Sequence, residues 1–242
     1  MSSTITGGKT TYGHIVGILM SDSTAPRIPG DPGHAETFPF PVIYEVLEGF
    51  PFDDLVAIKR DNVDILINKA IALQAKGVSL VVADCGLFGP FQEDFRTHLE
   101  VPFIGTALDI VVVLQRWLPP NQKVGILTGD TRILTINHLA ASGINAADGI
   151  EIAGMDNSAE FKRVVIERAR YLDVEKMRSE VLEAASTLKN RDLGAIVLEC
   201  TNLISFRYDI QKLLNVPVFD LVSLIDFHVS GLRTKRFQSN FM

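Results

Sequence analysis

The sequence predicts an α/β protein made of two pseudo-symmetric halves, each with a parallel sheet, and an active site in the cleft between the halves. Two observations carry this prediction. Short apolar runs alternate with helical patterns, and the apolar runs recur in the same order along both parts of the 242-residue chain. Strands that alternate with helices form parallel sheets that are covered on both faces.

Three pairs of apolar runs make up the repeat, each of the kind that forms a buried parallel strand. Residues 16–19 recur as 124–127 with the same letters, VGIL, residues 80–83 (LVVA) correspond to 195–198 (AIVL), and residues 101–104 (VPFI) correspond to 216–219 (VPVF). Such self-similarity at a fixed distance is typical of a duplicated architecture.

The spacing of two landmarks supports the duplication. Cys85 and Cys200 are 115 residues apart, and Pro102 and Pro217 have the same separation. We therefore expect a first half at residues 13–118, a second half at 121–229, and a C-terminal tail at 230–242 that is able to return to the first half. The residues between the two halves are prolines, which a helix does not easily continue through.

Helical patterns separate the predicted strands. Residues 61–76 carry apolar side chains at helical spacing and are followed by Gly77, a suitable C-cap, and residues 173–188 have charges opposite their apolar face. Ligands of such sheets bind beyond the carboxyl ends of the strands. Because Cys85 and Cys200 follow equivalent strands, the pseudo-twofold arrangement predicts that they meet at the interdomain cleft.

Composition excludes several classes of protein. The formal net charge is −6 and there is no basic stretch, so we expect no nucleic-acid partner. There is no apolar run of the roughly 18 residues that span a bilayer and no signal peptide at the start, so we expect no membrane partner and a cytoplasmic location. Closely spaced Cys and His pairs and nucleotide-binding motifs are absent, so we expect neither a metal nor another cofactor.

Two isolated thiols have three interpretations: inert core residues, a redox pair or catalytic residues. Packing is the common role of a free cysteine. Here, however, Cys85 and Cys200 are the only cysteines, they occupy equivalent positions, and each follows an acid at the end of an apolar run. These features favour a catalytic role for both.

The chemistry that suits such a pair is removal and return of a proton α to a carboxylate, with one thiol on each face of the carbon. The working base is a thiolate, so we expect a thiol pKa near ambient pH. Backbone N–H groups of the turns after each strand, which include Gly86 and Thr201, are candidates for binding the substrate carboxylate and its enolate-like transition state.

Other polar residues flank the predicted strand ends. Asp84 and Glu199 either bind a substrate ammonium or orient a thiol, or else face away from the site. Thr128 and Thr131 suit a carboxylate cradle. Asp130 or Thr131 is also a candidate N-cap of the next helix, and the two roles are compatible because a cap position presents backbone donors. The Pro- and Gly-rich residues 21–41 favour a lid or binding loop over disorder.

These residues resemble the aspartate/glutamate racemase superfamily, over residues 13–230. The marks are the strand-end cysteines, the run from Leu198 to Asn202 (LECTN) and the duplicated halves. The resemblance implies the two-domain fold, the cofactor-independent two-base mechanism, Asn202 as a substrate-binding residue beside Thr201, and a homodimer.

The chain departs from glutamate racemase itself, which has histidine where Asn202 stands and asparagine where Gly86 stands. It is more similar to the algal dimethylsulfoniopropionate lyase branch, through a Pro-Gly-Asp loop at 29–31, Asp-Cys-Gly at 84–86 with Phe-Gln at 91–92, and Leu-Glu-Cys-Thr at 198–201.

Three hypotheses follow. The first is a racemase or epimerase of a small carboxylate, such as an amino acid or a derivative. The second is a β-elimination lyase, and the third is a non-catalytic binding protein on the same scaffold.

Overall fold

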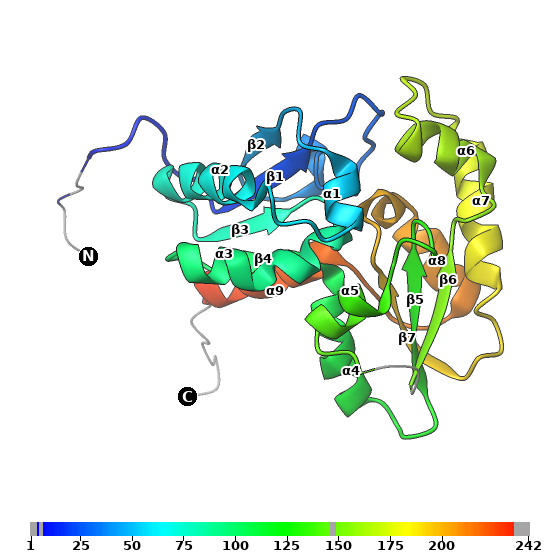
Figure 1. Ribbon diagram of the computed structural model, residues 1–242. Helices are drawn as coiled ribbons and strands as arrows, with labels where there is room; N and C mark the ends of the chain where they lie inside the picture. Colours follow the sequence, from blue (N-terminus) through cyan, green and yellow to red (C-terminus); the bar gives the residue numbers. More distant parts are fainter. Residues whose placement is uncertain (1–3, 5–6, 146–148, 235–242) are drawn as a thin grey trace, which may run out of the picture.

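Two four-stranded parallel sheets form the core of the computed structural model, which describes residue 4, residues 7–145 and residues 149–234. Both sheets have the same strand order, β2-β1-β3-β4 in the first half and β6-β5-β7-β8 in the second (Figure 1). The shared strand order and the parallel pairing confirm the predicted fold class. The strands are β1 (Val16–Ser21), β2 (Val42–Leu47), β3 (Leu80–Ala83), β4 (Phe103–Ile104), β5 (Lys123–Thr128), β6 (Ile150–Gly154), β7 (Leu193–Leu198) and β8 (Val218–Phe219).

The six predicted apolar runs all contain strands, but the sequence did not predict β2 and β6. Each of these lies at the edge of its sheet, beside β1 or β5. Residues of β2 and β6 are mostly half-exposed and do not form a continuous buried apolar run. The other two edge strands, β4 and β8, were found because the residues that begin their runs, Val-Pro, recur in both halves.

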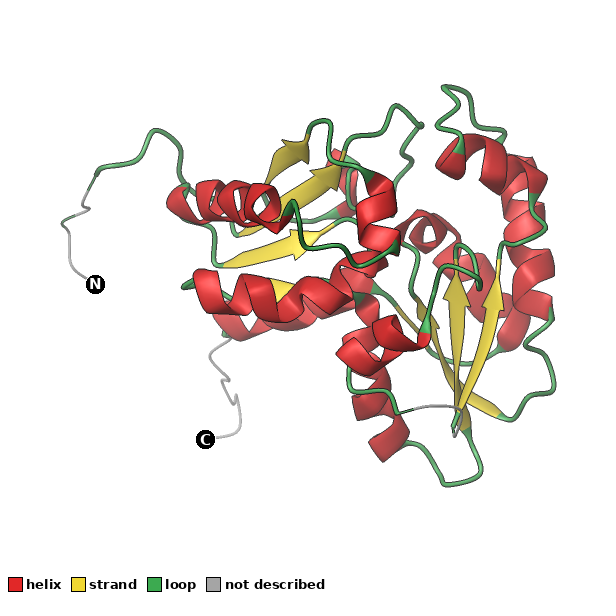
Figure 2. Ribbon diagram, in the orientation of Figure 1, coloured by secondary structure: helices red, strands yellow, loops and turns green. Residues whose placement is uncertain are grey.

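Helices cover both sheets (Figure 2), and the two predicted helices are confirmed within two residues at each end. Gly77 follows the first with φ 87°, a left-handed conformation that suits glycine. The Asp173 side chain caps the second by accepting the Lys176 N–H. The α-helices outside the two crossovers described next are α1 (Phe52–Val56), α2 (Val63–Ala75), α3 (Gln92–His98), α5 (Ile136–Ala141), α6 (Ala159–Phe161), α7 (Val174–Ser186) and α8 (Arg207–Leu214).

The two halves exchange their last helices. The segment formed by η3 (Ala107–Ile110) and α4 (Val111–Trp117) packs in the core of the second sheet, although it lies within the expected first half, 13–118. Helix α9 (Leu221–Leu232) packs in the core of the first sheet, although most of it lies within the expected second half, 121–229. Figure 1 shows α9 in red beside α3 and β4. The return to the first half therefore begins at residue 221. Residues 235–242 of the expected tail lie outside the described residues.

Residues 21–41 are anchored to both halves. Phe38 and Phe40 are buried in the core of the first half. Gly30 has φ 106°, and a Cβ there would lie 2.7 Å from the Cα of Ser205 in the second half. The loop therefore forms a packed wall of the cleft. Within the described residues, no helix has the length and apolar character that a membrane span requires.

Candidate active site

The carboxyl ends of β3 and β7 bring Cys85 and Cys200 into one pocket between the halves. Each cysteine begins a short 3-10 helix, η2 (Gly86–Phe91) after Cys85 and η5 (Thr201–Phe206) after Cys200. Both thiols are free and partly exposed. The structure thus joins two residues that are 115 positions apart in the sequence.

Equivalent backbone groups meet the two thiols. The backbone N–H of Leu87 lowers the pKa of Cys85 in part, and the backbone N–H of Asn202 lowers the pKa of Cys200 in part. In each case the donor is two residues beyond the cysteine, in the first turn of the 3-10 helix. These donors each lie one residue beyond Gly86 and Thr201, the turn residues that the sequence singled out.

The acids that precede the cysteines are both buried at the pocket: Asp84 is 4% exposed and Glu199 is 3% exposed. The Oδ1 atom of Asp84 accepts from the Ser21 N–H (2.9 Å) and hydroxyl (2.8 Å), and Oδ2 accepts from Arg27 (2.9 Å). Glu199 Oε2 accepts from the Thr128 hydroxyl (2.6 Å). Of the two, Asp84 has partners on both oxygen atoms.

These carboxylates act on both thiols. Burial raises the pKa of Cys85 well above its usual value, and the charges of Glu199 and Asp84 raise it further. Burial and then the charge of Glu199 also raise the pKa of Cys200. The expectation of a thiol pKa near ambient pH is therefore wrong for the pocket without a substrate. The physical reason is desolvation beside negative charge, which disfavours a thiolate.

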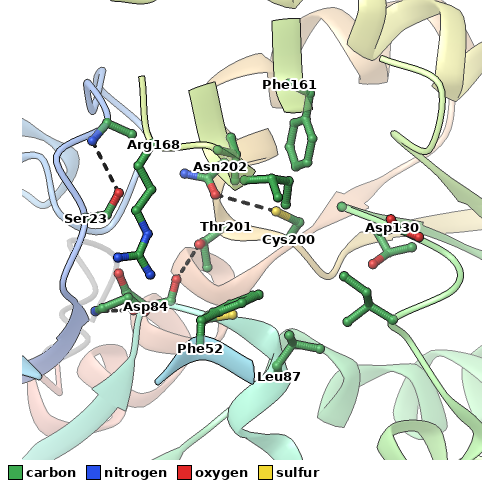
Figure 3. A pocket seen from close by; sticks show the side chains of 18 of the residues that line it. Ser23, Phe52, Asp84, Leu87, Asp130, Phe161, Arg168, Cys200, Thr201 and Asn202 are labelled. Carbon is green, nitrogen blue, oxygen red and sulfur yellow. Dashed lines mark hydrogen bonds between the residues drawn. The ribbon is translucent and has the colours of Figure 1, made fainter. Parts of the chain in front are cut away.

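Of the other predicted site residues, some line the pocket, Gly86 packs beside it, and Thr131 lies outside it. Thr128 and Asn202 line the pocket. Thr201 also lines it and joins the halves by donating its hydroxyl hydrogen to the Asp84 main-chain oxygen, as Figure 3 shows. Gly86 is packed against Glu199.

Thr131 is exposed and is not among the pocket-lining residues; its hydroxyl donates to Asp156 (2.6 Å). The cap of the following helix is neither Asp130 nor Thr131. Helix α5 begins at Ile136 and is capped by Thr135, because four residues of loop separate Thr131 from the helix.

Several pocket residues were missed by the sequence analysis. Arg27 joins Asp84 to Asp31, and the rings of Phe161 and Phe52 reach into the pocket from opposite sides of Cys200 (Figure 3). Arg168 also points into the pocket; its φ of 58° is unusual for a residue other than glycine. The local sequence gives no signal for these residues, since loops from both halves supply the arginines.

Arg168 differs from Arg27 in its charge partners. Arg27 forms ion pairs with Asp31 (2.7 Å) and Asp84 (2.9 Å). Among the described residues, Arg168 forms no ion pair, and its main-chain oxygen accepts from the Thr24 hydroxyl (3.2 Å). Within the described part of the chain, Arg168 is thus the pocket arginine that is free to meet an anion.

Two pseudo-symmetric parallel-sheet halves with the pocket between them define the class: this is the two-domain α/β architecture of the racemases. The sequence agrees, because the model of the Asp/Glu/Hydantoin racemase family matches residues 42–225. The chain belongs to this family of enzymes.

Proteins that are similar to this chain in sequence include dimethylsulfoniopropionate lyases. The chain is 26% identical over 226 residues to a dimethylsulfoniopropionate lyase of Durusdinium sp. clade D, covering 89% of this chain and 74% of that protein. It is 25% identical to dimethylsulfoniopropionate lyase 5 of Emiliania huxleyi (strain CCMP1516), covering 88% of this chain and 44% of that protein. The chain thus spans less than half of the second relative.

Among solved structures, the allantoin racemase of Klebsiella pneumoniae superposes with a TM-score of 0.58 at 18% identity, covering 94% of this chain and 97% of that chain. Other matched folds are glutamate and aspartate racemases and an arylmalonate decarboxylase. These similarities show the shared fold.

Proposed function

We propose that this protein is a cofactor-independent lyase, in which Cys85 and Cys200 act on a small carboxylate that carries a cationic leaving group on its β-carbon. The observation that carries the proposal is the presence of both thiols in one pocket at equivalent strand ends. The sequence similarity to dimethylsulfoniopropionate lyases supports elimination as the outcome, with a sulfonium carboxylate as the substrate.

The pocket has groups that complement both charges of such a substrate. Buried Glu199 and the rings of Phe161 and Phe52 suit a sulfonium cation, since aromatic faces and carboxylates attract cations. Arg168 suits the carboxylate, because a guanidinium binds carboxylate oxygens with two N–H groups. A bound cation also offsets the carboxylate charges that raise the pKa of both thiols, so binding itself favours a thiolate.

The proposed reaction is a β-elimination. A thiolate removes the proton from the α-carbon and becomes a thiol. The electron pair of that C–H bond forms the double bond, and the bond between the β-carbon and sulfur breaks with its electrons on sulfur. Dimethylsulfoniopropionate would give neutral dimethyl sulfide and acrylate. The cysteine proton then leaves to solvent, which restores the thiolate.

Racemisation is the second candidate. It shares the first step and is favoured by the equivalent positions of the two cysteines, which allow one thiol to remove the α-proton and the other to return a proton on the opposite face. The two candidates differ in the substrate: elimination needs a leaving group on the β-carbon, and racemisation needs a chiral α-carbon.

Proton NMR in D₂O distinguishes the candidates. The purified enzyme is incubated with dimethylsulfoniopropionate, with L- and D-amino acids, and with hydantoins. We expect vinyl signals from dimethylsulfoniopropionate that are lost in both Cys85→Ser and Cys200→Ser.

Deuterium at the α-position of an amino acid or hydantoin without vinyl signals would replace the lyase with a racemase. Full activity in either cysteine variant would overturn the use of both thiols. Inertness toward every compound would support the binding-protein hypothesis.

A further inference from the structure

A continuous chain of hydrogen bonds links the surroundings of the two cysteines. It runs from Asp84, next to Cys85, through Arg27 to Asp31, and from Asp31 to Asn202. The last contact joins the Cys200 thiol to the Asn202 side-chain oxygen at 3.7 Å (Figure 3). Loop 21–41 supplies the central members and the second half supplies the end of the chain.

Asp31 occupies a fixed position in this chain. It is 2% exposed, although it lies in a loop. Its Oδ1 atom accepts from Arg27 (2.7 Å) and from the Gly33 N–H (2.7 Å), and its Oδ2 atom accepts from Asn202 Nδ2 (3.1 Å). A buried carboxylate with three donors has little freedom to rotate, so it presents a fixed acceptor to the second half.

The carboxylate determines which way the Asn202 amide faces. A carboxylate accepts and does not donate, so the amide must turn its NH₂ group toward Asp31. The amide oxygen then faces the opposite way, toward the Cys200 sulfur. This oxygen accepts a hydrogen bond from the S–H group. A thiolate at the same place would be repelled by the partial negative charge of the amide oxygen. The contact therefore stabilises the protonated form of Cys200.

Cys85 has no equivalent contact among the described residues. The amide oxygen of Asn202 is specific to the second half, where Gly86 and Leu87 take the places of Thr201 and Asn202. The two thiols of this pseudo-symmetric site are therefore chemically different: Asn202 supplies the contact to Cys200, and Asp31 of loop 21–41 orients it.

We infer that Asp31 is a positioning residue for Cys200: it orients the Asn202 amide so that the amide oxygen faces the sulfur and favours the protonated thiol at Cys200. This inference rests on the proposed function for the use of Cys200 in the reaction. Three acidic groups, Glu199, Asp31 and Asp84, raise the pKa of Cys200, and two arginines, Arg27 and Arg168, line the same pocket. A change in the amide contact must therefore be separated from a change in charge.

Thiol alkylation tests the inference without any substrate. In a Cys85→Ser background, the rate at which iodoacetamide modifies Cys200 is measured against pH by mass spectrometry. Asn202→Ala removes the amide oxygen and retains Asp31, and we expect alkylation at a fixed pH below the midpoint to rise about fivefold, the effect of one hydrogen bond. Asp31→Asn is expected to raise the rate at least as much. Glu36→Gln, an exposed acid of the same loop, should leave the rate unchanged.

The double variant Asp31→Asn/Asn202→Ala separates orientation from charge. If Asp31 acts through the amide, its substitution has a smaller effect when Asn202 is already alanine than when Asn202 is present. Equal effects in both backgrounds would mean that Asp31 acts by its charge alone and would overturn the inference. An unchanged rate in Asn202→Ala would overturn it as well, even where Asp31→Asn does not fold.

A second comparison uses Cys85 as an internal reference. In a Cys200→Ser background, Asn202→Ala should leave the pH dependence of Cys85 alkylation unchanged, because the hydrogen bonds of that amide among the described residues go to Cys200 and Asp31. An equal shift at both thiols would contradict a specific role at Cys200. Loss of turnover without any alkylation change would instead count against this inference while leaving the proposed reaction in place.

Discussion

Substitution of Gly86 by alanine tests the packing that holds the two halves together at the site. A Cβ at this position would lie 2.6 Å from the main-chain oxygen of Glu199 and 2.7 Å from its side-chain Cδ atom. Rotation of the Glu199 side chain relieves only the second contact, so the strand ends must separate to accommodate the methyl group. Overpacking of this kind costs about 1–3 kcal/mol.

At a cost of about 2 kcal/mol, a chain of this size should lose about 4–8 °C in Tm. Calorimetry or thermal unfolding followed by circular dichroism measures this change. The matched control is Gly231→Ala in α9, where an added Cβ meets no atom within 4 Å. Alanine in a helix is more stable than glycine by about 0.5–1 kcal/mol, so its Tm should stay or rise. A Gly86→Ala protein as stable as the control would refute the close contact between the halves.

Three further predictions concern the charges of the pocket. Arg168→Gln should raise KM about tenfold through loss of a charge-assisted contact. Arg170 is likewise exposed but does not line the pocket, so Arg170→Gln should leave KM unchanged; equal KM values for the two variants would remove Arg168 from binding. Alkylation of Cys85 and Cys200 should be slower than that of free cysteine at neutral pH and accelerate as pH rises, since their pKa values are raised; fast alkylation at pH 7 would contradict this. The Glu199→Gln variant should become more stable than the wild type as pH rises from about 4. Its Tm advantage over the wild type should grow with pH, and an advantage that shrinks would contradict the prediction.

The sign of the last prediction follows from burial. Burial raises the pKa of Glu199 in the folded chain, although the Thr128 hydroxyl lowers it in part. The folded state therefore holds the proton more tightly than the unfolded state does. Stability falls as pH rises from the unfolded pKa toward the folded pKa, and the uncharged glutamine avoids this loss.

Prediction of the fold from the sequence succeeded where a segment is fully buried. β1, β3, β5 and β7 lie in the middle of their sheets and appear as apolar runs. Strands β2 and β6 gave no comparable pattern, because their side chains are mostly only partly buried and the two segments do not resemble each other in sequence. The exchange of α4 and α9 was also out of reach, because an apolar helix face does not specify which of two similar sheets it covers.

For the site, the sequence identified residues that follow buried strands. Cys85, Cys200, Asp84 and Glu199 all lie in the pocket because they end such strands. Thr131 illustrates the limit: three residues beyond β5 the chain has already turned away, and its hydroxyl binds Asp156 instead.

The sequence by itself determined the duplicated α/β architecture and the meeting of two thiols at one cleft. Both follow from local periodicity and a constant separation along the chain. Only the tertiary structure decided the electrostatics of that cleft, because the groups that set the thiol pKa and the charges of the pocket come from both halves. Arg27, Asp31 and Arg168 lie in loops whose position depends on packing. Their effect depends on distance and burial in three dimensions, which no spacing in the sequence specifies.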